Sequence, residues 1–97
     1  MMDLVVTGRA QAEITAAVGY RAERNALVAR QLLDDFTRRF DDLRRFPMMG
    51  RSRSDLRPDL RALLIENYIA FYFVEPEQIV IVRVLDGRMN VEQEFSE

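Results

Sequence analysis

Residues Leu60–Leu85 read LRALLIENYIAFYFVEPEQIVIVRVL, and this is the most apolar part of the chain. Its β-branched and aromatic residues gather in three runs that are typical of strands, at Leu60–Glu66, Tyr68–Val74 and Ile79–Leu85. Asn67 separates the first two runs, and asparagine tolerates the left-handed conformation that a tight turn requires. Glu75–Gln78 supplies the second turn. The sequence therefore predicts an antiparallel meander of three strands.

A long helical region precedes this meander. Apolar residues recur at spacings of three and four through its second half, at Ala29, Leu32, Leu33, Phe36, Phe40 and Leu43. The pattern is interrupted at Tyr20–Asn25, where Asn25 is suited to cap a second helix. Pro47 disfavours helical geometry at the preceding residue, so the second helix ends near Arg45. We predict two helices between Arg9 and Arg45, packed as a hairpin.

Shorter elements are predicted near both ends of the sequence. Asp3–Thr7 reads as a strand, and Thr7 is suited to cap the first helix. Val91–Ser96 reads as one helical turn, with Asn90 as its cap. The predicted fold class is α+β: an N-terminal strand, a helical hairpin packed on a mostly antiparallel sheet, the meander and a short C-terminal helical turn (β-αα-βββ). The 97 residues form one domain, 1–97.

Both faces of the predicted sheet are apolar. One face of Tyr68–Val74 carries Ile69, Phe71 and Phe73, and the other carries Ala70, Tyr72 and Val74. One face of Ile79–Leu85 carries Ile79, Ile81, Arg83 and Leu85, and the other carries Val80, Val82 and Val84. We expect Phe36, Phe40, Phe71 and Phe73 in the core. The helical hairpin covers one face, so we expect a protein partner to cover part of the other. The alternative is that the C-terminal turn and the Met48–Met49 loop cover it.

The composition excludes several kinds of chemistry. The chain has no cysteine, histidine or lysine, and all 14 basic residues are arginine. Disulfides, thiolate nucleophiles and the commonest metal ligands are therefore excluded, and we expect neither a metal nor a cofactor. Because arginine keeps its proton near neutral pH, proton transfer could come only from carboxylates or from Tyr20, Tyr68 and Tyr72.

Charge is distributed unevenly along the chain. The net charge of −2 argues against a dedicated nucleic-acid binder. Residues 44–61 hold six arginines and two aspartates, for a net charge of +4, whereas residues 62–97 have a net charge of −5. Arginine pairs bidentately with carboxylates, so an acidic protein segment is a suitable partner for residues 44–61. No apolar run could span a bilayer and no signal peptide is evident, so we expect a cytoplasmic protein without membrane contact.

Three motifs follow one another in the second half of the chain. They are FP..GR.R..L from Phe46, LR......Y...Y from Leu60 and RVLDGR from Arg83. Together with the β-αα-βββ order, they resemble the toxins of the RelE/ParE superfamily over nearly the whole chain, and the ParE branch most of all. The sequence departs from the ParE pattern at Phe73, where arginine is frequent, and at Asp86, where histidine is frequent.

The resemblance implies the toxin of a type II toxin–antitoxin system. The likeness to the ParE branch implies that it inhibits DNA gyrase by protein–protein contact without catalysis, and that a ParD-like antitoxin neutralises it in a hetero-oligomer. We expect the antitoxin to contact Arg51, Arg53, Arg57, Arg61 and Tyr72. We expect the target to contact Arg83, Arg88, Met89 and Asn90, together with the tail to Glu97. No catalytic residue is assigned, and no direct binding of nucleic acid is expected.

Other interpretations stay open at this point. The loop arginines could simply be solvated beside Asp55 and Asp59, and Arg61 or Arg83 could pair with a carboxylate such as Glu66. A RelE-type toxin would instead cleave mRNA on the ribosome, with Arg61, Arg83 and Arg88 on the phosphate and Tyr68 or Tyr72 for proton transfer. A third possibility is a protein-binding domain of the same fold without toxicity.

Overall fold

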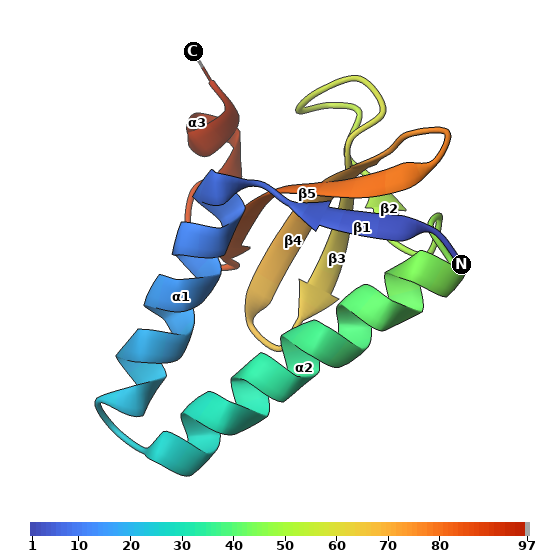
Figure 1. Ribbon diagram of the computed structural model, residues 1–97. Coiled ribbons are helices and arrows are strands. Elements are labelled where there is room, and N and C mark those ends of the chain that lie inside the picture. Colours follow the sequence, from blue (N-terminus) through green and yellow to red (C-terminus); the bar gives the residue numbers. More distant parts are fainter. Residues whose placement is uncertain (97) are drawn as a thin grey trace.

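A computed structural model describes residues 1–96 and contains one five-stranded sheet, two long helices packed on one of its faces, and a short helix near the C-terminus (Figure 1). The elements are β1 (Asp3–Val6), α1 (Gly8–Ala22), α2 (Ala26–Arg45), β2 (Arg51–Ser52), β3 (Arg61–Ile65), β4 (Tyr68–Val74), β5 (Gln78–Asp86) and α3 (Val91–Phe95). The strand order is β1-β5-β4-β3-β2, with β1 parallel to β5 and the other neighbours antiparallel. The predicted α+β class is confirmed, and β2 is an addition too short for a sequence pattern to reveal.

The two long helices begin at the predicted caps. At the start of α1, Thr7 Oγ1 accepts a hydrogen bond from Ala10 N at 3.2 Å. At the start of α2, Asn25 Oδ1 accepts one from Leu27 N at 2.9 Å. Each cap satisfies a backbone donor that would otherwise have no partner within the helix. Among residues 1–96, no helix combines the length and the apolar character needed to cross a membrane.

The main core lies between the helices and the sheet. Its buried members are Ala10, Ile14, Ala17, Leu32, Phe36, Leu43, Leu63, Ile65, Tyr68, Ala70, Tyr72, Ile79, Ile81 and Val84. The predicted apolar face of α2 is correct except at Leu33, whose side chain is 48% exposed, whereas Leu32 is fully buried. Neighbouring helical residues point about 100° apart, so these two leucines do not both face the sheet.

The outer face of the sheet is covered largely by the chain itself. A second cluster contains Leu60, Ala62, Phe71, Leu85 and Phe95, with Leu56, Ile69, Phe73, Val82 and Val91 packed against it. Phe95 comes from α3, and its ring meets that of Phe71 at a centroid distance of 4.9 Å. α3 and residues 53–60 thus contribute to covering this face, as the alternative held for the C-terminal turn, while a partner on the rest of it stays a prediction. Met48 and Met49 take no part and are 64% and 40% exposed.

A bulge in β5 changes which side chains face the helices. In the β4–β5 register, Phe71 pairs with Arg83 but Tyr72 pairs with Ile81, which leaves Val82 as an extra residue. The strict alternation predicted for Ile79–Leu85 is therefore wrong beyond Ile81. Val84 joins the main core, while Val82 packs on the outer face.

The tight turn between β3 and β4 is held by α1. Glu66, not Asn67 as predicted, has the left-handed conformation, with φ of 53°. This conformation is unfavourable for glutamate. Arg21, near the end of α1, donates hydrogen bonds to Glu66 Oε1 and to Asn67 Oδ1, each at 2.6 Å. The helix thus stabilises a turn that the local sequence does not favour.

Candidate functional site

The arginine loop, defined as Phe46–Arg61, is attached to the sheet by Tyr72. This side chain is fully buried, and its hydroxyl donates to Pro47 O at 2.7 Å and accepts from Gly50 N at 2.9 Å. Burial raises the pKa of the Tyr72 phenol above its ordinary value. A Cβ atom at position 50 would lie 2.5 Å from the Tyr72 hydroxyl, so this approach requires glycine. Tyr72 holds the loop in place and offers no surface to an antitoxin, contrary to the prediction.

Two arginines of the loop are engaged within the chain. Arg53 donates from Nε and Nη2 to the two carboxylate oxygens of Asp55, each at 3.0 Å. This pair holds the pKa of Asp55 below its ordinary value. The Arg57 guanidinium lies 5.7 Å from the centre of the Phe95 ring and donates to Leu56 O at 2.9 Å. These contacts favour a structural contribution from both arginines, which the sequence left undecided.

Arg51 and Arg61 have a different environment. The side chain of Arg51 is exposed on β2 and makes no hydrogen bond or ion pair within residues 1–96. Arg61 is half-buried on β3, where its Nη2 donates to Met48 O at 3.3 Å. Its Nε is buried and has no hydrogen-bond partner in the described part of the chain. Neither of these two arginines pairs with a carboxylate within residues 1–96.

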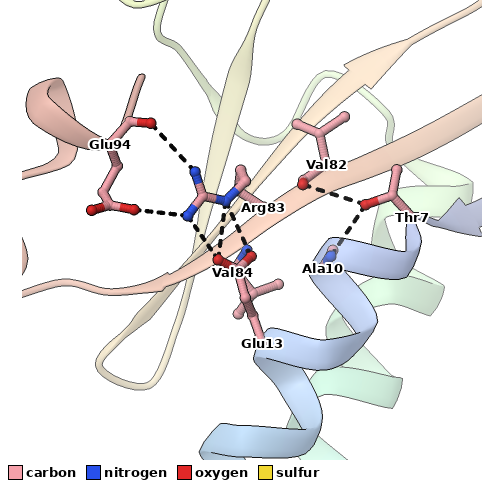
Figure 2. A network of polar contacts seen from close by, with 7 residues as sticks. All are labelled: Thr7, Ala10, Glu13, Val82, Arg83, Val84 and Glu94. Carbon is pink, nitrogen blue, oxygen red and sulfur yellow. Dashed lines mark hydrogen bonds and ion pairs between the residues drawn. The ribbon is translucent and has the colours of Figure 1, made fainter. Parts of the chain in front are cut away.

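Arg83 lies at the centre of a network that joins α1, β5 and α3 (Figure 2). Its Nη2 donates to Glu13 Oε2 at 2.8 Å and to Glu94 Oε1 at 2.9 Å, and the residue is only 6% exposed. The hydrogen bond to Glu13 raises the pKa of Arg83 further. Two expectations are corrected here: Arg83 is not on an open surface, and its partner is not Glu66, which pairs with Arg21.

Glu13 also closes an open edge of the sheet. β1 pairs with β5 only as far as Ile81, so the backbone of β5 beyond that point has no neighbouring strand on this side. Thr7 Oγ1 donates to Val82 O at 3.4 Å, and Glu13 Oε1 accepts from Val84 N at 2.8 Å (Figure 2). The beginning of α1 therefore takes the place of a missing strand and satisfies buried backbone groups.

The residues after β5 form a tight, exposed turn. Arg88 donates from Nε and Nη2 to the Asp86 carboxylate, and these bonds hold the pKa of Asp86 at about 2. The Arg88 side chain is 83% exposed and Met89 is 43% exposed. Asn90 caps α3 as predicted, because its Oδ1 accepts from Gln93 N at 3.1 Å. Arg88 and Met89 thus remain as accessible members of the predicted target-binding set, while Glu97 lies outside the described residues.

A groove of about 400 Å³ is lined by α1, the end of β5, the turn that follows β5 and Glu94 of α3. Arg88 and Met89 lie on one side of it, and Ala16 and Tyr20 of α1 line the other. Tyr20 is 52% exposed and its ring lies 4.6 Å from the Arg24 guanidinium. From the sequence, Tyr20 was a candidate only for proton transfer. Nothing in the local sequence could have placed it in the same groove as Arg88, because the packing of α1 on β5 decides that placement.

Comparison with known proteins assigns the chain to a family. Residues 4–91 match the family model described as ParE toxin of type II toxin-antitoxin system, parDE. This chain belongs to the ParE toxin family. Toxin ParE3 of Caulobacter vibrioides is 48% identical over 52 residues, which are 54% of this chain and 52% of that relative, so the match spans about half the length of each. A solved structure titled "Chromosomal ParDE TA system from P. aeruginosa" has the same fold, with a TM-score of 0.75 at 24% identity over 89% of this chain and 96% of that one.

The motifs that resembled ParE toxins occupy positions with clear structural consequences. The FP..G motif forms the segment that Tyr72 holds, and Tyr72 is itself the second tyrosine of the LR......Y...Y motif. The RVLDGR motif begins at the buried Arg83 and ends at the exposed Arg88. In this ParE family member, most of the motif residues therefore build the scaffold, and a smaller number remain exposed for a partner.

Proposed function

We propose that this ParE family protein is a cytoplasmic toxin that inhibits DNA gyrase by protein–protein contact, and that a ParD-like antitoxin neutralises it. The family match over residues 4–91 is the observation that carries this proposal. The similarity in fold to a structure titled as a ParDE system supports a complex with an antitoxin. The lack of histidine, lysine and cysteine supports an inhibitor that acts by contact and not by catalysis.

The positions of the arginines also favour an inhibitor without nuclease activity. RNA cleavage would need cations around one phosphate and a nearby group that accepts a proton. Arg61 pairs with Tyr72 in the register and Arg83 pairs with Phe71, so the two arginines belong to opposite faces of the sheet. Arg83 is already bound to two carboxylates, and Arg88 follows the end of β5. Arg83 and Arg88 line one groove together with Tyr68, but Arg61 lies apart from them on the other face of the sheet, and Arg83 is already held by Glu13 and Glu94.

The exposed residues of the groove beside α1 are our candidates for the gyrase contact. Arg88, Met89 and Tyr20 combine a cation, a flexible apolar side chain and an aromatic ring on one surface. Side chains of these kinds are common at protein interfaces. Arg83 contributes indirectly, because it ties the three elements that form this groove.

Gyrase inhibition is tested with purified toxin, purified gyrase and relaxed plasmid. We expect the toxin to inhibit supercoiling or to trap cleaved DNA, and Arg88→Glu to weaken this effect about tenfold, which corresponds to ~1.4 kcal/mol. Arg30→Glu is the matched control, because it changes the charge equally on an exposed position of α2. Deletion of residues 91–97 should also reduce toxicity more than antitoxin binding, but it removes the buried Phe95 and is the less specific variant.

Two results would replace this proposal. Normal supercoiling together with mRNA cut at the ribosome would favour the RelE-type endonuclease, with Arg61, Arg83 and Tyr68 or Tyr72 as the first residues to change. Normal supercoiling with intact mRNA and no toxicity in cells would favour a protein-binding domain that is not a toxin.

Antitoxin binding is tested by co-expression with the product of the neighbouring reading frame, followed by affinity measurements over a range of salt concentrations. We expect tight binding by a segment that is disordered when free. The Arg51→Ala, Arg53→Ala and Arg57→Ala triple variant should bind more weakly and with less dependence on salt. A control with Arg9, Arg30 and Arg38 changed to Ala removes the same charge from the helices. Equal affinity of the loop triple and the wild type at low salt would contradict a role for these arginines.

A further inference from the structure

A small polar hollow lies beside β2, the edge strand of the sheet. It has a volume of about 210 Å³ and is lined by Met48, Ser52, Ser54, Asp59, Leu60, Arg61 and Val74. Arg61 is the cation among these residues. The hollow is large enough for a carboxylate and a few water molecules but too small for a nucleotide or a helix.

Arg61 has hydrogen-bonding capacity that the chain does not use. A guanidinium has five N–H donors, and the bond from Nη2 to Met48 O at 3.3 Å is long for a hydrogen bond. The Nε donor is buried and has no partner within residues 1–96. A buried donor without an acceptor is unfavourable and is uncommon in native structures. Arg61 also lines the hollow, so an acceptor that enters it would meet a guanidinium with unused donors.

Other shielded arginines of the same protein have such an acceptor. Arg21 pairs with Glu66 at 2.6 Å, Arg53 pairs with Asp55 at 3.0 Å, and Arg83 pairs with Glu13 at 2.8 Å. Their side chains are 19%, 18% and 8% exposed, respectively. Arg61 differs from these three, since no ion pair joins it to a carboxylate anywhere in residues 1–96.

The rest of the hollow does not suit an anion with two charges. Ser52 Oγ and Ser54 Oγ lie 2.8 Å apart, and because one hydroxyl hydrogen serves this contact, the other can be donated to an incoming oxygen. Asp59 also lines the hollow, so its walls carry one positive and one negative charge. They hold no excess positive charge for a phosphate dianion, whereas the planar guanidinium fits one carboxylate.

We propose that this hollow, the Arg61 pocket, receives one aspartate or glutamate side chain of the antitoxin. The proposal rests on the proposed function, because it names the chemistry of one antitoxin contact. Ser52 belongs to edge strand β2, whose outer side has no strand neighbour among the described residues. An extended peptide lying along that edge would bring its side chains past the pocket.

The pocket is tested directly by NMR on the free chain, with the Nε–Hε signals of the arginines as reporters. The chain is titrated with sodium acetate, with sodium phosphate and, in parallel, with sodium chloride at matched ionic strength. We expect acetate to cause a saturable shift of the Arg61 signal and little change at Arg53, whose carboxylate partner is already present. An Arg61 response to acetate no greater than that to chloride would overturn the proposal. Tighter binding of phosphate than of acetate would overturn the assignment to a carboxylate.

The second test compares stability and affinity in Arg61→Met, which keeps the apolar part of the side chain and removes the guanidinium. For the free chain we expect an unchanged or higher Tm, because the unsatisfied donor is lost. For the complex with the antitoxin we expect affinity to fall by about 10- to 100-fold. Arg51→Met is the control at an exposed arginine on the same strand pair. A lower Tm with unchanged affinity would mean that Arg61 is merely structural.

The two tests distinguish failure of the pocket from failure of the proposed function. If the wild-type chain binds no antitoxin, the proposed function fails, and so does the assignment of the Arg61 pocket to an antitoxin carboxylate. The acetate titration still shows whether the pocket binds an anion. If the wild type binds tightly and Arg61→Met binds equally tightly, the pocket proposal fails and the proposed function stands.

Discussion

Replacing Glu13 with alanine removes two interactions at once from the network in Figure 2. The carboxylate accepts hydrogen bonds from the Arg83 guanidinium and also from Val84 N, at 2.8 Å in both cases. In Glu13→Ala, Arg83 keeps its second carboxylate partner, Glu94, but loses the one bound through both Nε and Nη2. The Val84 N–H, on the part of β5 that β1 does not reach, loses its acceptor.

The size of the effect follows from burial. Breaking a buried ion pair from one side costs about 3–5 kcal/mol, and the Glu94 contact that remains reduces this to roughly 2 kcal/mol. Leaving a buried backbone N–H without an acceptor adds about 1 kcal/mol. We therefore expect Glu13→Ala to lower the free energy of unfolding by about 3 kcal/mol. For a domain of this size, that corresponds to a fall in Tm of about 12–24 °C.

Chemical denaturation of four variants tests this reasoning. Glu13→Gln keeps an oxygen for Val84 N but loses the charge, so it should be destabilised by about half as much as Glu13→Ala. Arg83→Met combined with Glu13→Ala should recover part of the loss, because the guanidinium that keeps only Glu94 is no longer buried, and Arg83→Met alone completes the double-mutant cycle. A loss below about 1 kcal/mol in Glu13→Ala, or no coupling between positions 13 and 83, would refute the network as a source of stability.

Three further predictions concern the loop and the turn. Gly50→Ala should lower the free energy of unfolding by about 1–3 kcal/mol, because the new Cβ would lie 2.5 Å from the Tyr72 hydroxyl. Gly19→Ala is the control: its Cβ would meet open space on helix α1, so it should raise the free energy of unfolding by about 1 kcal/mol. Thermal denaturation compares the two variants. Tyr72→Phe should cost about 1–2 kcal/mol in the same assay, because Gly50 N loses its buried acceptor. The pKa of Asp86 in the folded chain, about 2, lies below its ordinary value of 3.8. Its pairing with Arg88 therefore contributes stability above about pH 4, and this contribution is lost as the pH falls towards 2. The difference in Tm between the wild type and Asp86→Asn should accordingly shrink between about pH 4 and pH 2.

Much of the fold could be predicted because its signals act over a few residues. The β4 strand was predicted with the bounds observed, Tyr68–Val74, since a run of β-branched and aromatic residues has few other stable conformations. Asn25 and Asn90 were recognised as helix caps, because a cap is defined by donors two or three residues away. The exposed Arg88 and Met89 could likewise be selected from composition and position near the chain end.

The roles of the buried polar residues could not be predicted in this way. Tyr72 was expected at an antitoxin interface, but its hydroxyl holds a loop 22 and 25 residues away in the sequence. The missing alternation in β5 has a similar origin, because one extra residue at Val82 moves the following side chains to different faces. A bulge has no dependable local signature in a run of valines and isoleucines.

The sequence by itself determined the order and type of every element except the short strand β2, the arginine-rich loop and the absence of the usual catalytic side chains. Only the tertiary structure decided which arginines are already paired. Arg83 found its carboxylate in Glu13, 70 residues away, and Arg53 found Asp55 two residues away, whereas Arg61 has none within residues 1–96. The physical reason is that the fate of a charge depends on its burial and on which partners packing brings within hydrogen-bonding distance, and both are properties of the folded chain.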